Sequence, residues 1–165
     1  MHAKASTAVV LGLVLSAAGQ TISPAPARAQ QPVPMKVTVT VGGKTETLRG
    51  TGRCGHEPRA SLYGAAAALW LAEYTGGAQA PRVSLTYWRF ATGNEVQFSL
   101  AVDRKSATHR INTVKGGKLA GSGRATFQPT AQGGRFKIAG KAQNGASLQA
   151  TIECARFGSI AAEGG

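Results

Sequence analysis

The amino-acid sequence predicts an all-β protein: an antiparallel β-sandwich, or a barrel-like sheet, of about eight or nine strands closed by one disulfide. Three features of the chain indicate this class. Short segments alternate apolar with polar residues at a period of two. Turn residues interrupt these segments about every ten positions, as is typical of sandwiches and barrels. The chain has only two cysteines, Cys54 and Cys154.

The first half of the chain contains well-defined strand patterns. Gly42-Gly43 favours a two-residue hairpin turn, and Thr-Gly-Asn at 92–94 favours another turn. Between such turns, one side of each strand is expected in a core and the other near water. We expect the core to contain Trp70, Trp88 and Phe98. The expected strands are residues 37–41, 44–48, 83–88 and 95–102.

Residues 60–74 are rich in alanine, and alanine favours helix. Trp70, Ala72 and Tyr74 would nevertheless share one face of a strand. We expect a strand from about residue 69 to 74, preceded by a turn or a short helix.

The second half of the chain reads as shorter strands. The small residues at 121–123 indicate a bulge or a close approach of two backbones. Residues 115–118 and Asn144-Gly145 are turn signals. The expected strands are residues 109–114, 119–127, 135–141 and 147–154.

Residues 1–29 have the three parts of a secretory signal peptide. Lys4 is the basic start, residues 8–18 are the apolar run, and Ala27-Arg28-Ala29 fits the cleavage pattern. A membrane anchor is the alternative, but that run is shorter than the roughly 20 residues that span a bilayer. We expect export to the periplasm, the cell surface or the medium, with no transmembrane segment after cleavage. Residues 30–157 would form one β domain, and residues 158–165 a loose tail.

Export permits disulfides, and two cysteines most simply pair with each other. A pair between Cys54 and Cys154 would span 100 residues of sequence. A two-cysteine metal site or a redox pair is the alternative, but the chain has no Cys-x-x-Cys spacing. We expect no cofactor and no metal.

The chain is strongly basic, with 19 Lys and Arg against 7 Asp and Glu. Two of the basic residues lie in the predicted signal, which leaves a net charge of +10 on the mature chain. Residues 104–152 contain nine basic residues and no acid. A field of one sign concentrates anions near a surface. The alternative is that these residues are only the solvated side of a sheet.

Two surfaces could therefore bind an anionic polymer or glycan. The first is a basic hairpin rim made of Arg104, Lys105, His109, Arg110, Lys115 and Lys118. The second is Tyr87 beside Arg89, which alternation would place on one face as an exposed stacking platform. A cross-strand pair that only stabilises the sheet would explain Tyr87 and Arg89 as well.

Residues that could support catalysis are few. Asp103 and His109 would need Ser99, Ser106 or Ser122 as a nucleophile, and no nucleophile motif surrounds them. The carboxylates stand alone in the sequence, and His56-Glu57 would point to opposite faces of a strand rather than bind one metal. We therefore expect no enzyme.

The two ends of the chain resemble the mycobacterial small lipoprotein-antigen family. At the start, residues 37–44 are followed by Gly50, Gly52 and Cys54; at the end, residues 134–142 are followed by Ile152-Glu153-Cys154. The resemblance covers about 40 residues, and Gln20 stands where the lipidated cysteine would be. It implies a compact, disulfide-closed β domain of the cell envelope without enzymatic activity.

The sequence thus predicts a monomeric, exported, non-catalytic binding protein of the envelope or medium, with a basic face for an anionic polymer. Two alternatives remain open. The protein could be a structural or antigen-like envelope protein with a protein partner, or an inhibitor of an extracellular hydrolase.

Overall fold

The computed structural model describes residues 31–77, 80–93 and 95–161. The predicted signal at 1–29 and residues 162–165 of the expected tail lie outside these ranges. No helix in the described residues is long and apolar enough to cross a membrane. The strands are β1 (Val33–Val41), β2 (Lys44–Leu62), β3 (Ala65–Tyr74), β4 (Arg82–Phe90), β5 (Val96–Arg104), β6 (Ala107–Asn112), β7 (Ser122–Pro129), β8 (Gly134–Lys141), β9 (Ser147–Cys154) and β10 (Gly158–Ser159).

Nine strands form one continuous antiparallel path in the order β6-β5-β4-β3-β2-β1-β9-β8-β7. Neighbouring strands in this path are consecutive in sequence except at the β1–β9 pair, which joins the end of the chain to its beginning. β10 lies off the path and pairs in parallel with β2. The expected antiparallel fold of eight or nine strands is confirmed.

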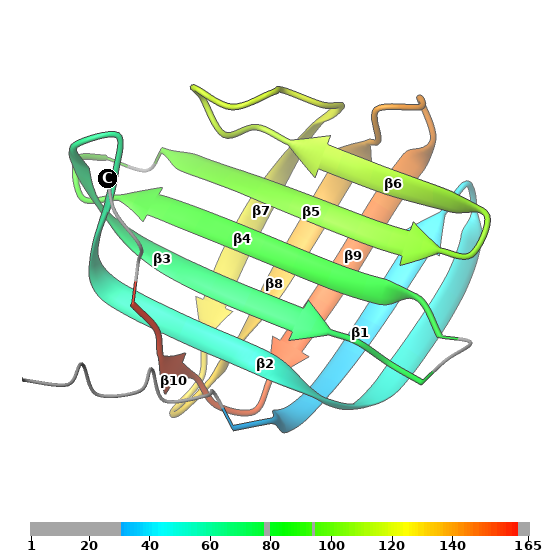
Figure 1. Ribbon diagram of the computed structural model, residues 1–165, viewed down its shortest axis with the longest axis horizontal. Helices are drawn as coiled ribbons and strands as arrows, with labels where there is room; N and C mark the ends of the chain where they lie inside the picture. Colours follow the sequence, from blue (N-terminus) through cyan, green and yellow to red (C-terminus); the bar gives the residue numbers. More distant parts are fainter. Residues whose placement is uncertain (1–30, 78–79, 94, 162–165) are drawn as a thin grey trace, which may run out of the picture.

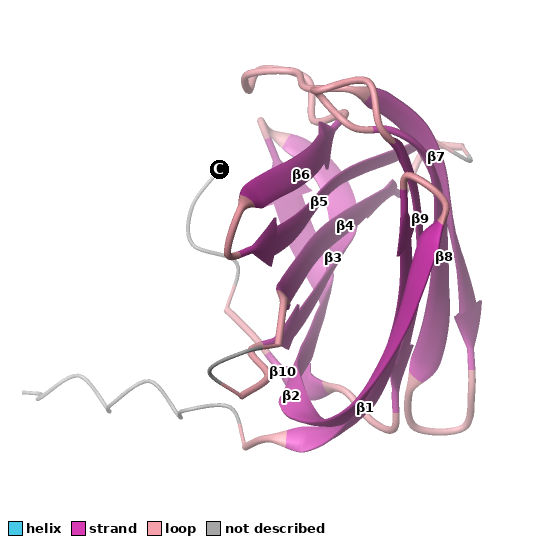
Figure 2. Ribbon diagram, turned by 90° about the vertical axis from the view of Figure 1, so that its right-hand side faces the viewer, coloured by secondary structure: helices cyan, strands magenta, loops and turns pink. Residues whose placement is uncertain are grey.

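The path folds over on itself into two facing layers. Figure 1 shows β2 to β6 in front, with β7, β8, β9 and β1 crossing behind them, and Figure 2 shows the two layers from the side. β2 belongs to both layers, because its first half pairs with β1 and its second half with β3. The result is a sheet nearly closed into a barrel.

The corner in β2 requires glycine. Gly52 is the last β2 residue paired with β1, and the next residue already pairs with β3. A side-chain carbon at Gly52 would lie 2.3 Å from the carbonyl oxygen of Glu73 and 2.3 Å from the sulfur of Met35. The strand can therefore pass from one layer to the other only where it has no side chain.

The open seam lies between β6 and β7. A path of nine alternating strands leaves its two ends running the same way, so an ordinary antiparallel ladder cannot close it. Loop contacts close the seam instead. Asn112 and Ala120 exchange backbone hydrogen bonds of 2.7 and 3.1 Å, and the Gln143 N–H donates to the carbonyl of Arg110 at 2.9 Å.

The core fills the space between the layers with inward-facing side chains. Val37, Val39, Phe98, Phe136 and Ile152 are at most 1% exposed. The predicted disulfide is confirmed: Cys54 on β2 and Cys154 on β9 are bonded, with their Cα atoms 6.2 Å apart. It ties the second half of β2 to the opposite layer.

The alanine-rich segment is a strand, and no helix precedes it. β2 continues to Leu62, a two-residue turn follows, and β3 begins at Ala65, earlier than expected. Ala67 pairs with Ala60 on one side and Phe90 on the other, so ladder pairing overrides the helical preference of alanine.

Two other local expectations can be compared with the structure. The close approach expected at 121–123 is confirmed, because a side-chain carbon on Gly140 would lie 2.1 Å from the carbonyl oxygen of Ser122. Gly158 and Ser159, the first residues of the expected tail, form β10 against Gly55 and His56.

Candidate functional site

The structure does not bring the six residues of the predicted basic rim together. Arg104 and His109 face the inside of the barrel, in line with the inward Val102, and Arg110 faces outward. Lys105 lies in the β5–β6 turn. Lys115 and Lys118 lie in the loop that leaves the other end of β6.

Several members of this rim also have partners of their own. Arg104 forms a 3.3 Å ion pair with Glu46. His109 Nδ1 lies 3.2 Å from the Asn144 amide nitrogen, and Lys115 lies 2.7 Å from Glu95. The role of these residues in binding stays a prediction.

The expected exposure of Tyr87 is wrong. Tyr87 is 3% exposed and packs edge-on against Trp70 with ring centroids 5.6 Å apart. Burial raises the pKa of the Tyr87 hydroxyl, and the nearby Arg89 partly opposes that shift. A ring enclosed in this way cannot form a stacking surface for a ligand.

The placement of Trp88 in the core is also wrong, because adjacent residues of a strand point to opposite sides and Tyr87 occupies the inner side of β4. Trp88 is half-buried on the outer face, opposite Leu69, while Trp70 and Phe98 are in the core as expected. The alternation of Val83, Leu85 and Tyr87 already contained the correct assignment, because all three lie on one side of β4. Arg89 is exposed, and its guanidinium carbon lies 5.2 Å from the centre of the Trp70 ring.

The largest group of like charges lies on the back layer. We define the basic face as the outward residues of β7, β8, β9, β1 and the first half of β2. Its side chains follow the ladder registers of these five strands. They are Pro34, Lys36, Thr38, Thr40, Thr45, Thr47, Arg49, Thr51, Ser122, Arg124, Thr126, Gln128, Arg135, Lys137, Ala139, Lys141, Ser147, Gln149, Thr151 and Glu153.

Most of these side chains fall into three rows that cross all five strands. In such a sheet, neighbours within a row are about 4.8 Å apart and successive rows about 6.8 Å apart. The rows are Gln128–Arg135–Glu153–Lys36–Arg49, Thr126–Lys137–Thr151–Thr38–Thr47 and Arg124–Ala139–Gln149–Thr40–Thr45.

Threonine hydroxyls order part of this surface. Thr40 and Thr45 lie 2.7 Å apart between their hydroxyl oxygens, and Thr38 and Thr47 lie 3.3 Å apart. Cross-strand threonine pairs stabilise a sheet and fix the direction of their hydroxyl groups. The hydroxyls therefore stand in a regular array among the cations.

The basic face has six cations and one acid. The cations are Lys36, Arg49, Arg124, Arg135, Lys137 and Lys141, and the acid is Glu153. Glu153 is shared between Lys36 at 3.8 Å and Arg135 at 3.2 Å. Among the described residues, the other four cations form no ion pair within 4 Å.

The face is also hollowed. A groove of about 830 Å³ lies at the start of β1 and the end of β9, and its lining includes Lys36, Arg49 and Arg135. A smaller hollow of about 300 Å³ lies over the second and third rows, which contain the threonines. A linear ligand could therefore contact cations in the groove and threonine hydroxyls in the smaller hollow.

The outward side of the front layer differs in charge. We define the balanced face as the outward residues of β3 to β6 and of the second half of β2. It has three basic and three acidic residues: Arg53, Arg82, Arg110, Glu57, Glu73 and Asp103. Arg53 forms an ion pair with Glu73, and Arg82 stands opposite Asp103. The charges on this face compensate one another.

The residues considered for catalysis do not assemble. Asp103 faces outward and accepts a 2.7 Å hydrogen bond from Thr108, whereas His109 faces inward beside Val102. In the described part of the chain, no three His, Cys, Asp or Glu residues are grouped to hold a metal.

His56 lies at the inner surface of the front layer. Its ring stacks on Trp70 at 4.4 Å, and its Nε2 atom is buried without a hydrogen-bond partner among the described residues. Burial lowers the pKa of His56, and Arg89 lowers it further, while Glu57 opposes the shift.

No family model, curated protein or solved structure matched the chain. The resemblance of its two ends to the lipoprotein-antigen family therefore stays a prediction.

Proposed function

We propose that the protein is an exported binding protein whose basic face holds an anionic polymer. The observation that carries the proposal is the contrast of six cations to one acid on the basic face with three to three on the balanced face. A sheet does not need such an excess for its own stability, because like charges that stand opposite each other destabilise a ladder.

The kind of polymer follows from the side chains that accompany the cations. The basic face as defined contains threonines and glutamines but no aromatic residue. Proteins that bind single-stranded nucleic acid commonly stack its bases on aromatic rings. A surface of cations and hydroxyls instead suits an anionic glycan, whose charged groups and hydroxyls can both find partners. Such a polymer would lie outside the cytosol, where the predicted signal would take the protein.

The test compares matched charge changes on different surfaces. The first variant carries Arg124→Gln, Arg135→Gln and Lys137→Gln; the second carries Arg82→Gln, Lys105→Gln and Arg110→Gln. Both lose three positive charges, so a difference between them reports position rather than net charge. Retention on lipopolysaccharide, a heparin-like glycan and DNA is measured across a salt series with the protein purified after export.

At 0.15 M salt, where charges are screened over about 8 Å, we expect the first variant to lose affinity by about tenfold or more. The second variant should bind nearly as the unaltered protein does. If the second variant loses affinity and the first does not, the site lies on the front layer around Arg82, Lys105 and Arg110, and the proposal for the basic face is wrong. If neither changes, the positive charge is only a solvated surface and protein partners become the better hypothesis.

A further inference from the structure

Two hairpin turns of this protein share one backbone geometry but differ in sequence. Gly42-Gly43 joins β1 to β2 with φ values of +55° and +81°, and Tyr63-Gly64 joins β2 to β3 with +50° and +80°. Each is a two-residue turn with both central residues left-handed. Tyr63 is the single non-glycine residue with positive φ in the described part of the chain.

Tyrosine is a costly choice at this position. A bulky L-residue with positive φ is an outlier, and turns of this kind favour Asn-Gly or Gly-Gly. Tyr63 does not repay the cost by burial, because 66% of it is exposed. Strained residues of this sort cluster at functional sites.

The ring of Tyr63 lies against a second segment. A side-chain carbon on Gly116, whose φ is +87°, would come within 2.8 Å of the ring. Gly116 belongs to the loop between β6 and β7, so the β2–β3 turn and this loop form one tip. Leu119 in the same loop is 63% exposed, and Tyr63 and Leu119 are the two exposed large hydrophobic residues of the described chain.

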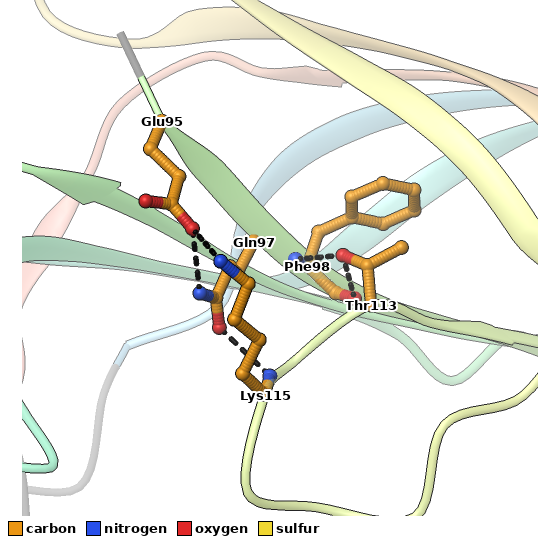
Figure 3. Close-up of polar contacts among 5 residues, drawn as sticks. All are labelled: Glu95, Gln97, Phe98, Thr113 and Lys115. Carbon is orange, nitrogen blue, oxygen red and sulfur yellow. Dashed lines mark hydrogen bonds and ion pairs between the residues drawn. The ribbon is translucent and has the colours of Figure 1, made fainter. Parts of the chain in front are cut away.

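The loop is held in place where it leaves β6. Figure 3 shows the contacts that join it to β5. The Phe98 N–H donates to the Thr113 hydroxyl at 2.9 Å, and the Lys115 N–H donates to the buried Gln97 side chain at 2.9 Å. Glu95 accepts from Lys115 at 2.7 Å. The exposed position of Leu119 therefore belongs to a loop fixed by several hydrogen bonds.

The tip also carries positive charge. Lys118 is exposed beside Leu119, and its backbone carbonyl accepts a 2.8 Å hydrogen bond from the Asn112 amide. Tyrosine is enriched at membrane–water interfaces, leucine enters the acyl region, and lysine is attracted to anionic headgroups. These three side-chain types occur in the turn and the loop that meet where the Tyr63 ring lies against Gly116.

We propose that this tip, formed by Tyr63, Gly64 and residues 114–119, docks on the surface of an anionic phospholipid membrane. Tyr63 and Leu119 enter the interface, and Lys118 contacts the headgroups. A glycan could also stack on Tyr63, but it would leave the exposure of Leu119 unexplained. The membrane accounts for both apolar side chains and for the lysine between the loop glycines and Leu119. This site is separate from the basic face.

The test uses sedimentation with sucrose-loaded vesicles of 7:3 phosphatidylcholine and phosphatidylglycerol. The key variant is Tyr63→Asn, because asparagine suits a left-handed turn position and so removes the ring while preserving the turn. Leu119→Ser removes the second apolar group. Gly42→Asn is the matched control, since it creates the same Asn-Gly sequence in the β1–β2 turn.

We expect Tyr63→Asn and Leu119→Ser each to weaken vesicle binding by about tenfold, and Gly42→Asn to leave it unchanged. Tyr63→Trp, which keeps an interfacial ring, should retain binding. All variants are purified after export in the same way as the unaltered protein, so differences in vesicle binding report the substituted residues. Circular dichroism checks that each variant is folded.

Two results would overturn the proposal. In the first, folded Tyr63→Asn and Leu119→Ser bind these vesicles as tightly as the unaltered protein. In the second, Tyr63→Asn keeps vesicle binding and loses retention on a glycan column, which would make the ring a sugar platform.

Discussion

The outer faces of the two layers differ in charge, although the inner faces of the same layers are both apolar. Both layers alternate buried apolar residues toward a common core. On the outside, the basic face has rows of threonine with six cations, whereas the balanced face has paired charges and a half-buried Trp88.

The comparison separates what the fold requires from what it leaves free. Strand alternation requires only that outward positions tolerate water. The balanced face meets that requirement with neighbouring opposite charges. The basic face instead places Lys36 directly opposite Arg49, an arrangement that costs stability and so points to a role beyond folding.

The largest expected effect concerns the bond that holds the two layers together. Replacing both Cys54 and Cys154 by serine opens a covalent link across 100 residues of sequence. A loop of that size corresponds to about 4.7 kcal/mol of unfolding free energy. Urea unfolding followed by tryptophan fluorescence and far-UV circular dichroism measures the loss. We expect the two probes to give one transition, because β2 belongs to both layers.

A different result would change the comparison itself. Two separate transitions in the serine variant would mean that the layers unfold independently and that each face belongs to its own unit. A loss well below 1 kcal/mol would mean that loop closure contributes little here.

The second prediction tests the two faces without any ligand. Raising NaCl from 0.05 to 0.5 M screens repulsion between like charges, so stability to urea should rise by about 1 kcal/mol. The Arg124→Gln, Arg135→Gln, Lys137→Gln variant should lose most of this rise. Arg82→Gln, Lys105→Gln, Arg110→Gln should keep it. Equal salt responses in the two variants would show that the excess charge is spread over the molecule and is not concentrated on one face.

The sequence predicted the fold because the fold depends on local patterns. Alternation in residues 37–41 and 95–102 places their strands directly, and Gly42-Gly43 fixes a hairpin. The disulfide follows from having only two cysteines in a chain that we predict to be exported. The long β2 was not predicted. Its passage between the layers depends on the close approach of Gly52 to Met35 on β1 and to Glu73 on β3, and neither neighbour can be read from the sequence around Gly52.

The candidate site was harder to predict. A run of basic residues along the sequence does not indicate which side of the sheet each residue occupies, and the basic face combines residues from five strands that are paired across the sheet. The basic span at 104–152 includes Arg104 and His109, which face inward, and omits Lys36 and Arg49. One signal for the omitted pair was present: a two-residue turn at Gly42-Gly43 sets Lys36 opposite Arg49. The pairing of β1 with β9, which adds the other cations, has no local signal.

The third prediction compares a hairpin turn of each layer. Tyr63→Asn relieves the left-handed tyrosine in the β2–β3 turn, so we expect stability to rise by about 0.5 kcal/mol. Gly42→Asn replaces an unstrained glycine and should change stability little. Urea midpoints of the two variants measure the difference. A clear loss of stability in Tyr63→Asn would show that the contact between the tyrosine ring and Gly116 outweighs the strain.

The smallest expected effect is a pH dependence that belongs to the front layer alone. Burial against Trp70 lowers the pKa of His56 below its ordinary value of 6.5. Between that lowered pKa and 6.5, the unfolded chain binds more protons than the folded protein. Stability contributed by neutral His56 is therefore complete above pH 6.5 and declines as the pH falls through this window.

Variants of the groups around His56 test this cause directly. His56→Phe keeps a ring on Trp70 but cannot titrate, so the decline between pH 7.5 and 5.5 should become shallower. Arg89 lowers the pKa of His56 and Glu57 raises it. Arg89→Gln should therefore make the decline shallower, and Glu57→Gln should make it steeper. If all three variants show the unaltered slope in urea titrations, groups other than His56 set the pH dependence. In that case protonation of the His56 ring has no measurable effect on the free energy of unfolding.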